Sequence, residues 1–316
     1  MREKQEVQVA GRTVPLSNQD KVMFPAAGFT KAQVIDYYVR AWPFLRPHLK
    51  NRPVTLKRYP NGIEGKHFYE KDAPGFTPEW IETFPVPRRD GGPDIRYVVV
   101  NDLPTMVWCA NLANLEIHPF LHRVPKLGQP TSLVFDLDPG EGVDILACGR
   151  VAMLLKTLFE KLKLEIFPKV SGSKGMQVYA PLNTAVTYEE TQPFARAVAQ
   201  LLEREHPDLV VSEMAKTARH NKVFIDWSQN SDFKTTVSVY SLRAKRPLPY
   251  VSMPVTWDEL KRALKKSDPK MLEWQSGAAL TRMEKSGDLF EPVSKLKQKL
   301  PSLTASERGA AYKSRD

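Results

Sequence analysis

The amino-acid sequence predicts a mixed α+β fold, and three observations lead to this prediction. Short runs with the alternating or continuous apolar pattern of strands are interleaved with runs whose apolar residues recur at helical spacing. The chain has 316 residues, enough for one large or two ordinary domains with a sizeable core. Hydrophobic residues make up 42% and charged residues 26% of the chain, which is ordinary for a soluble globular protein.

The N-terminal part, residues 1–125, mixes short strands, helices and proline-rich loops, and we expect it to form an α/β module. Thr30 is predicted to cap a helix whose apolar stripe contains Val34, Tyr37, Tyr38 and Leu45. Residues 53–60 alternate like a strand with cations on one face. Residues 86–100 are typical of an exposed basic turn that leads into a strand.

The order of elements is clearer in residues 126–284, the predicted catalytic core. The expected elements are, in order, a strand, a helix, two strands joined by the turn SGSKG, a helix and a strand, over residues 131–138, 143–162, 164–170, 176–182, 188–205 and 221–227. This β-α-β-β-α-β order is the split βαβ or RRM-like arrangement. In that topology the first and last strands lie side by side at the centre of an antiparallel sheet. Residues 285–316 are polar and are predicted to form a loosely attached tail.

Three acids interrupt the apolar strands of this core. Asp136 and Asp138 are two residues apart on the first strand, so both side chains point to the same face. Asp226 lies within the apolar run of the last strand, next to the first in the predicted sheet. Three converging carboxylates are what a two-metal site needs, and their oxygen atoms suit Mg²⁺ or Mn²⁺. A chance D-x-D pair at a strand end is the alternative for Asp136 and Asp138 alone.

The turn that joins the second predicted strand of the core to the third, residues 170–177, is a candidate phosphate loop. Its two glycines permit tight turns that can direct N–H groups at an anion, and Ser171 and Lys174 add a hydroxyl and a cation. It lacks the spacing of a P-loop, and a plain hairpin turn is the alternative. Its place beside the acidic strand favours triphosphate binding.

Other polar residues have a structural alternative of similar weight. His118 follows an apolar stretch, and a lone histidine is more often structural than functional, so the sequence alone does not select it. Arg219 and Arg243 flank the last strand and fit phosphate recognition or a solvated loop. The N-terminal part interleaves cations and other polar residues with aromatics, a pattern suited to a nucleic-acid strand or to core aromatics beneath surface lysines: Asn18, Lys21, Lys31, Lys57, Arg58, Phe68 and Tyr69.

Charge and composition narrow the class of partner. The formal net charge of +10 favours polyanions such as nucleic acids or nucleotides, although a basic protein that is merely soluble is nearly as common. No run of ~18 apolar residues is present, so no membrane span or membrane partner is expected. The charged N-terminus and the two cysteines without metal-ligand spacing favour a reducing cytoplasm without structural zinc.

Several motifs together resemble the polymerase domain of bacterial DNA ligase D, of the archaeo-eukaryotic primase superfamily. They are SLVFDLDPG, LEIHPF, KVSGSKGMQVY, VFIDWSQN and TVSVYSLRAKRPLPYVSMPV, with LSNQDKVMFPAAGFTKAQVIDYY and PVTLKRYPNGIEGKHFYEK upstream. The resemblance covers roughly residues 8–285. It implies a primase-type, RRM-like catalytic core packed against the N-terminal α/β module.

The resemblance also implies residue roles. The acids matching Asp136, Asp138 and Asp226 hold two catalytic metals, Mn²⁺ or Mg²⁺. Residues around the incoming NTP or dNTP match Lys57, His118, Ser171, Lys174, Arg219 and Arg243. Those that hold a downstream DNA 5′-phosphate match Asn18, Lys21 and Lys31. Phe68 and Tyr69 match residues that pack against the template.

The implied activity is template-directed nucleotide addition at DNA gaps and double-strand-break ends in non-homologous end joining, often with ribonucleotides. We see no K-x-D-G ligase motif and no nuclease-like histidine cluster, so we expect a free-standing polymerase or an excised domain. The expected partners are a Ku-type end-binding protein and a DNA ligase, in cis or in trans, in a nucleoid-associated cytoplasmic setting. A primase that starts chains without a primer and a non-catalytic end-bridging module remain alternatives.

Overall fold

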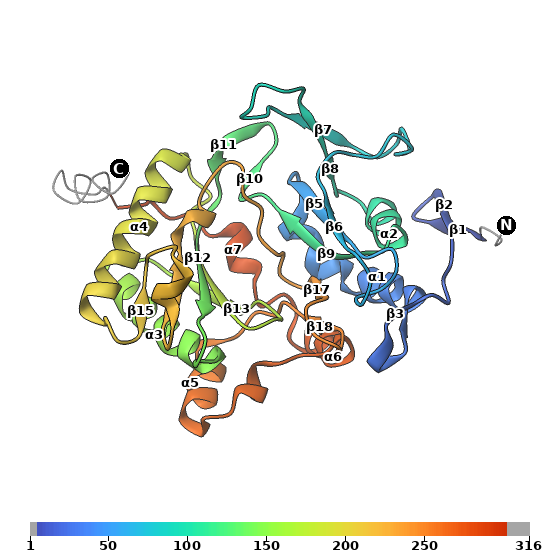
Figure 1. The fold of residues 1–316 in the computed structure, drawn as a ribbon. Helices are drawn as coiled ribbons and strands as arrows, with labels where there is room; N and C mark the ends of the chain where they lie inside the picture. Colours follow the sequence, from blue (N-terminus) through green and yellow to red (C-terminus); the bar gives the residue numbers. More distant parts are fainter. Residues whose placement is uncertain (1–4, 302–316) are drawn as a thin grey trace. The chain divides into compact units, whose positions relative to one another are not determined.

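The computed structural model describes residues 5–301, which form two compact units (Figure 1). The chain alternates between them: of the described residues, unit 1 contains 5–125, 235–253 and 274–288, and unit 2 contains 126–234, 254–273 and 289–301. Among residues 5–301, no helix combines the length and the apolar character that crossing a membrane requires.

Unit 1 is built around a five-stranded antiparallel sheet in the order β6-β5-β8-β7, with β9 also paired to β5. Its elements before residue 125 are β1 (Gln5–Val9), β2 (Arg12–Leu16), β3 (Val22–Phe24), η1 (Pro25–Ala27), β4 (Phe29–Thr30), α1 (Lys31–Leu49), β5 (Pro53–Arg58), β6 (Phe68–Glu70), β7 (Thr83–Val86), β8 (Ile95–Val99), α2 (Leu103–Asn111), β9 (Asn114–Pro119) and β10 (His122–Arg123). The later segments add β17 (Leu242–Arg243), β18 (Tyr250–Val251) and α6 (Ser276–Ser286).

The predicted helix after Thr30 is α1, and its start follows from local chemistry. The Thr30 hydroxyl accepts from the Gln33 N–H, while the Gln33 side chain accepts from the Thr30 N–H, so two otherwise unpaired donors of the first turn are satisfied. The predicted apolar stripe is buried. Tyr37 and Tyr38 each donate a buried hydroxyl to a backbone carbonyl, of Tyr240 and Leu115 respectively. These bonds fix α1 against β9 and the returning segment.

Unit 2 contains a five-stranded sheet in the order β13-β14-β12-β16-β15. Its elements are β11 (Lys126–Pro130), β12 (Ser132–Pro139), α3 (Ile145–Lys161), β13 (Phe167–Val170), β14 (Met176–Pro181), α4 (Tyr188–Glu205), β15 (Val210–Val211), η2 (Lys216–Arg219), β16 (Val223–Asp226), η3 (Trp227–Gln229), α5 (Trp257–Lys266), η4 (Pro269–Leu272) and α7 (Glu291–Lys295). α3 packs on β12, β14 and β16, and α4 packs on β12.

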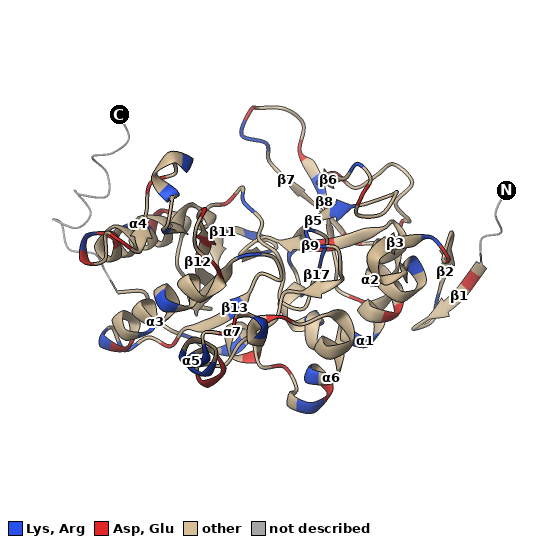
Figure 2. Ribbon diagram, turned by 60° about the horizontal axis from the view of Figure 1, so that its bottom comes forward, with Lys and Arg blue, Asp and Glu red and all other residues tan. Residues whose placement is uncertain are grey.

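The pairing in unit 2 agrees with the predicted neighbours. β12 lies between β14 and β16 and is antiparallel to both, so the first and last predicted strands are adjacent. The short strand β15, parallel to β16 at the edge, was not expected. Cations lie on the exposed side of α5 and in the loop between β7 and β8 (Figure 2).

The two units divide the chain differently from the predicted domains 1–125, 126–284 and 285–316. The boundary after residue 125 coincides, but residues 235–253 and 274–288 belong to unit 1. Hydrogen bonds explain the difference, because Tyr240 bonds to α1 and the partly buried Asp288 accepts from His48 and from the Tyr240 hydroxyl.

The segment that follows Asp288 is also more firmly attached than a loose tail would be. Phe290 and Val293 are buried in unit 2. Asn183 donates to two carbonyls of this segment, and the Gln298 side chain bonds to the backbone of Glu165 and Pro181. Residues 302–316 of the predicted tail lie outside the described residues.

Candidate active site

The acid cluster, which we define as Asp136, Asp138 and Asp226, lies on the two central strands of the unit 2 sheet. Asp136 on β12 is paired in register with Asp226 on β16. Asp138 lies two residues further along β12 and therefore on the same face. Asp136 and Asp226 are partly buried, and Asp138 is exposed. The arrangement places like charges on facing positions, which destabilises a sheet unless a cation offsets them.

The ionisation of Asp136 reflects this crowding. Burial, followed by the charges of Asp138 and Asp226, raises the pKa of Asp136 to about 7, although a hydrogen bond from Gln177 and the charge of Lys169 act in the opposite direction. Asp136 belongs to a row of register partners that runs across the sheet. On the side away from Asp226, Asp136 is paired with Gln177, and Gln177 is paired with Lys169. Lys169 is fully buried and is a member of this row that the sequence did not single out.

Asp226 has local partners of its own. Its carboxylate accepts from the Ser228 N–H at 2.9 Å, from the Ser228 hydroxyl and from Gln229, and it lies 3.8 Å from Lys234 Nζ. It therefore caps η3. In keeping with this, residues 5–301 contain no group of three or more His, Cys, Asp and Glu side chains arranged to hold a metal ion. The oxygen donors of the acid cluster nevertheless fit a hard divalent cation in their chemistry and excess negative charge.

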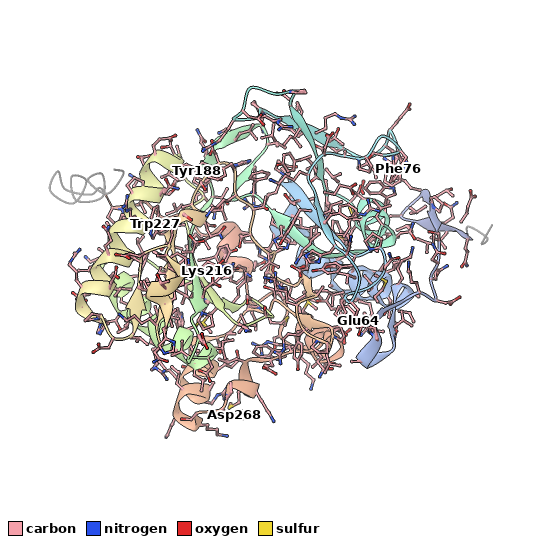
Figure 3. All side chains as sticks on the ribbon, viewed as in Figure 1. Glu64, Phe76, Tyr188, Lys216, Trp227 and Asp268 are labelled. Carbon is pink, nitrogen blue, oxygen red and sulfur yellow. The ribbon has the colours of Figure 1, made fainter. Side chains whose placement is uncertain are left out.

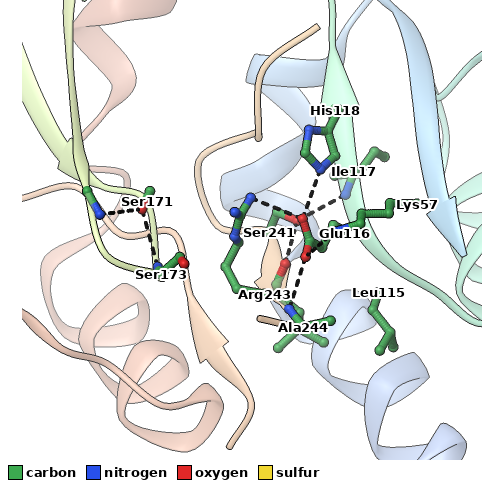
Figure 4. Close-up of polar contacts among 12 residues, drawn as sticks. Lys57, Leu115, Glu116, Ile117, His118, Ser171, Ser173, Ser241, Arg243 and Ala244 are labelled. Carbon is green, nitrogen blue, oxygen red and sulfur yellow. Dashed lines mark hydrogen bonds and ion pairs between the residues drawn. The ribbon is translucent and has the colours of Figure 1, made fainter. Parts of the chain in front are cut away.

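The predicted phosphate loop joins β13 to β14 beside the acid cluster. The Ser171 hydroxyl accepts from the N–H groups of Ser173 and Gly175, so it shapes the loop and takes two of the donors predicted to face an anion (Figure 4). Gly175 packs so closely on β12 that a Cβ would lie 2.4 Å from the Leu137 carbonyl oxygen. The loop therefore needs glycine there to lie against the acid-bearing strand. Lys174 is exposed at the tip.

Arg219 is held next to the turn that ends β12. A Cβ on Gly140 would lie 1.7 Å from the Arg219 carbonyl oxygen, so only glycine permits this approach. The guanidinium stacks 3.7 Å from the centre of the Phe224 ring and donates to the Met214 carbonyl. Its buried Nε has no hydrogen-bond partner within the described residues.

Unit 1 holds a second group of charges, the Glu116 cluster, drawn in Figure 4. Its centre is the fully buried carboxylate of Glu116 on β9. Oε1 accepts from the Lys57 ammonium at 3.4 Å, the Tyr59 hydroxyl at 3.3 Å and the Ala244 N–H at 3.1 Å. Oε2 accepts from His118 Nε2 at 3.0 Å and pairs with Arg243 Nη1 at 3.1 Å. The structure thus brings together three predicted site residues: Lys57, His118 and Arg243.

Electrostatics in the Glu116 cluster differ from those in the acid cluster. Burial opposes ionisation of Glu116, but the hydrogen bond from His118 and the charges of Arg243, His118 and Lys57 outweigh it and hold the pKa of Glu116 well below its ordinary value. The pKa of Lys57 and that of His118 are both lowered, because burial outweighs the opposing effect of the Glu116 charge. The sequence analysis missed Glu116. Its signal was an acid inside the apolar run LEIHPF, the same signal that identified Asp226.

The predicted template aromatics lie on β6, next to these cations. Phe68 is 44% and Tyr69 is 53% exposed, so both rings are open to a ligand. The Arg58 guanidinium lies 5.2 Å from the Phe68 ring centre, and the Lys57 ammonium lies 5.3 Å from that of Tyr69. Phe76 is 64% exposed on the following loop (Figure 3). Aromatics beside cations form a surface suited to stacked bases and phosphates.

The three residues predicted to hold a 5′-phosphate gather at the start of α1. The Lys21 N–H bonds to the Asn18 carbonyl, and the Lys31 N–H bonds to the Lys21 carbonyl. Lys31 is buried, and its ammonium donates to the Asn111 carbonyl at 2.8 Å. Burial, then the charge of Lys21, lowers the pKa of Lys31 to about 8. Asn18 is exposed and Lys21 partly so.

Comparison with known proteins gives consistent relationships. A family described as "LigD, primase-polymerase domain" matches residues 30–290. The multifunctional non-homologous end joining protein LigD of Mycolicibacterium smegmatis is 40% identical over 282 residues, which are 89% of this chain and 36% of that protein. The bifunctional LigD of Bacillus subtilis is 35% identical over 247 residues, 78% of this chain and 39% of that protein. The chain thus spans little more than a third of these relatives.

A solved structure gives the same relationship in three dimensions. The polymerase domain of Mycobacterium tuberculosis ligase D in complex with DNA has a TM-score of 0.83 and 39% sequence identity. The match covers 90% of this chain and 99% of that one. The family match over residues 30–290 includes parts of both units.

Proposed function

Because the chain belongs to the LigD primase-polymerase domain family, we propose that it adds nucleotides to DNA in a template-directed reaction, filling gaps and extending ends during non-homologous end joining. The observation that carries the proposal is the acid cluster: Asp136 and Asp226 in register on adjacent central strands, with Asp138 on the same face. Like charges on facing strand positions destabilise a sheet, and a bound divalent cation would offset their repulsion. We also propose that the unit 2 sheet, with its two covering helices, is an RRM-like catalytic core.

The acid cluster would hold two divalent cations, Mg²⁺ or Mn²⁺. Such ions, when bound, activate the attacking 3′-hydroxyl and stabilise the charge on the transferred phosphoryl group and the leaving pyrophosphate. Asp136 and Asp138 present their oxygens from one strand, and Asp226 presents its own from the neighbouring strand. The raised pKa of Asp136 favours this role, because a cation would restore the ionised form.

Nucleotide recognition is proposed for residues of each unit. In unit 2, Ser171 shapes the phosphate loop, Lys174 offers an exposed cation, and Arg219 keeps an unpaired Nε donor. In unit 1, Lys57, His118 and Arg243 carry donors for phosphate oxygens. A preference for ribonucleotides, with Lys57 and Ser171 near the 2′-hydroxyl, is part of the proposal.

DNA recognition is proposed for two surfaces of unit 1. Asn18, Lys21 and Lys31 would hold the 5′-phosphate on the downstream side of a gap, since charged donors bind phosphate without reading sequence. Phe68 and Tyr69 would stack on template bases. A Ku-type end-binding protein and a DNA ligase are the proposed partners, and a cytoplasmic, nucleoid-associated site is the proposed location.

The test is single-turnover extension on a gapped duplex that bears a downstream 5′-phosphate. NTPs and dNTPs are compared with Mn²⁺ and with Mg²⁺, and Asp136→Ala is the inactive control. Asp144→Asn is the matched control. Asp144 caps α3 and lies outside the acid cluster, and asparagine at that position can cap the helix as well. Template-matched addition that is lost only in Asp136→Ala supports the proposal. Tight end binding without addition under any metal would favour the end-bridging module, and synthesis on unprimed template would favour a primase.

A further inference from the structure

Glu116 is the feature of the structure that the proposed reaction does not use. Its carboxylate is buried at the centre of the unit 1 sheet, and its register partner on β5 is Lys57. A carboxylate has about four lone-pair sites. Five donors occupy them, from β5, from the loop after β5, from β9 and from the segment of β17. Glu116 therefore has no capacity left for a ligand and serves only its neighbours.

The neighbours have a common character. Lys57 and Arg243 are buried cations, at 2% and 6% exposure, and His118 is nearly as buried. Cations removed from water and placed side by side are strongly destabilising unless an acid pairs with them. Among the described residues, Glu116 is the acid that pairs with all three. It makes their close approach possible.

Lys57 and Arg243 keep donors in reserve, and His118 keeps its second ring nitrogen. Arg243 uses Nη1 on Glu116, and its buried Nε has no hydrogen-bond partner within residues 5–301. Lys57 has three ammonium hydrogens, and the rings of Tyr59 and Tyr69 flank its Nζ at 5.3 Å. His118 uses Nε2 on Glu116 and meets Tyr69 edge to face. Glu116 therefore holds one end of each of the three side chains, and the two cations Lys57 and Arg243 outnumber the one carboxylate.

We propose that Glu116 is the positioning residue that fixes Lys57, His118 and Arg243 in a single arrangement for the triphosphate of the incoming nucleotide. The inference rests on the proposed function. One carboxylate aligns three donors before the ligand arrives, so the ligand does not have to order three long side chains. The alternative is that Glu116 stabilises the unit 1 core and has no effect on nucleotide binding.

The experiment measures NTP affinity without turnover. The parent protein, Glu116→Gln and Glu116→Asp are bound to a gapped duplex whose primer ends in a 2′,3′-dideoxynucleotide, and ATP opposite a template thymine is titrated in with Mg²⁺. Asp288→Asn is the matched control, because Asp288 is also an acid of unit 1, partly buried, that bonds to a histidine and a tyrosine. Thermal unfolding of every variant is measured alongside.

Glu116→Gln should weaken ATP affinity by about tenfold or more, because an amide cannot accept from all the donors and removes the negative charge. Duplex affinity should stay within twofold of the parent. Asp288→Asn should lower the unfolding temperature and leave ATP affinity unchanged. ATP affinity within twofold of the parent in folded Glu116→Gln would overturn the inference.

Glu116→Asp keeps the proposal testable if Glu116→Gln does not fold. It retains the charge but shortens the side chain by one methylene, so it should also weaken ATP affinity while preserving the unfolding temperature better than Gln. Parent-like ATP affinity in this variant would overturn the positioning role. If the parent itself does not bind ATP, both the proposed function and the role of Glu116 are wrong.

Discussion

The acid cluster of unit 2 and the Glu116 cluster of unit 1 solve the problem of charge in a sheet in opposite ways. In the acid cluster, like charges face each other across β12 and β16, and burial and repulsion raise the pKa of Asp136 to about 7. In the Glu116 cluster, one acid is surrounded by cations, and its pKa lies below the ordinary value. Acids are in excess in the first cluster and cations in the second.

The difference teaches how to separate a structural charge from a functional one. Glu116 is satisfied by the protein, so its own charge needs nothing from outside. The acid cluster instead places three carboxylates together, and their mutual repulsion contributes to the raised pKa of Asp136. A cluster rich in charge of one sign predicts a ligand of the other sign: a divalent cation for the acid cluster and a polyphosphate for the cations of the Glu116 cluster.

The largest expected effect comes from removing an acid where acids are in excess. Asp136→Ala should reduce nucleotide addition by about 10³-fold or more, since several kcal/mol of transition-state stabilisation depend on the bound cations. DNA binding should stay near that of the parent. Single-turnover extension and equilibrium binding to gapped DNA measure the two effects, with Asp144→Asn as the control. Extension retained by pure Asp136→Ala would rule out the metal assignment.

A second prediction asks whether the cations of unit 1 act separately. The double variant Lys21→Ala, Lys31→Ala loses two charge-assisted contacts to phosphate. Its preference for a 5′-phosphorylated gap should therefore fall about 10²-fold. The ratio of affinities for phosphorylated and unphosphorylated gaps measures the preference. The double variant Lys50→Ala, Lys285→Ala removes the same charge from exposed positions of unit 1. If the ratio is unchanged by the first pair, the phosphate assignment is wrong.

A third prediction sharpens the account of the Glu116 cluster. Arg243→Lys keeps the positive charge but loses the forked guanidinium, so the KM for NTP should rise about tenfold. Arg246→Lys is the matched control, because Arg246 stacks on Tyr250 in the same loop region and lies outside the cluster. Steady-state kinetics over a range of NTP concentrations measure the effect. An unchanged KM would mean that charge alone is recognised.

The smallest expected effect is on pH dependence. Burial lowers the pKa of Lys31 to about 8, so the charged fraction of its ammonium falls about fourfold between pH 7 and pH 8.5. The preference for a 5′-phosphate should decline over that interval. Binding titrations with phosphorylated and unphosphorylated gaps at each pH measure it. Lys31→Arg should remove the decline, because arginine stays charged; a decline of equal size in that variant would contradict the assignment.

Much of the fold follows from local sequence patterns. The predicted helix 188–205 coincides with α4, because Thr187 and Glu190 form a capping box at its start. The predicted adjacency of the first and last core strands places Asp136 opposite Asp226, which the structure shows directly. These features depend on periodicity and on a known topology, and both can be inferred from one chain.

The features that depend on distant contacts could not be predicted. The return of residues 235–253 to unit 1 rests on bonds such as that from the Tyr37 hydroxyl to Tyr240, 203 residues away. The saturation of Glu116 requires Arg243 and Ala244, which lie on a segment that follows the first segment of unit 2. The cap that Asp226 provides to η3 depends on side-chain rotamers. No periodicity in the sequence reports these contacts.

The alternation of the chain between the two units has a consequence for synthesis. Three segments of each unit alternate, so the polypeptide passes from one unit to the other five times, the last time after Asp288. A ribosome would therefore release the third segment of unit 1 only after most of unit 2 has been made. In many multidomain proteins the N-terminal domain folds while the next domain is translated. Unit 1 cannot complete its fold in that order, because its last segment follows most of unit 2. Unit 1 therefore becomes complete only once residue 288 has been made, after most of unit 2.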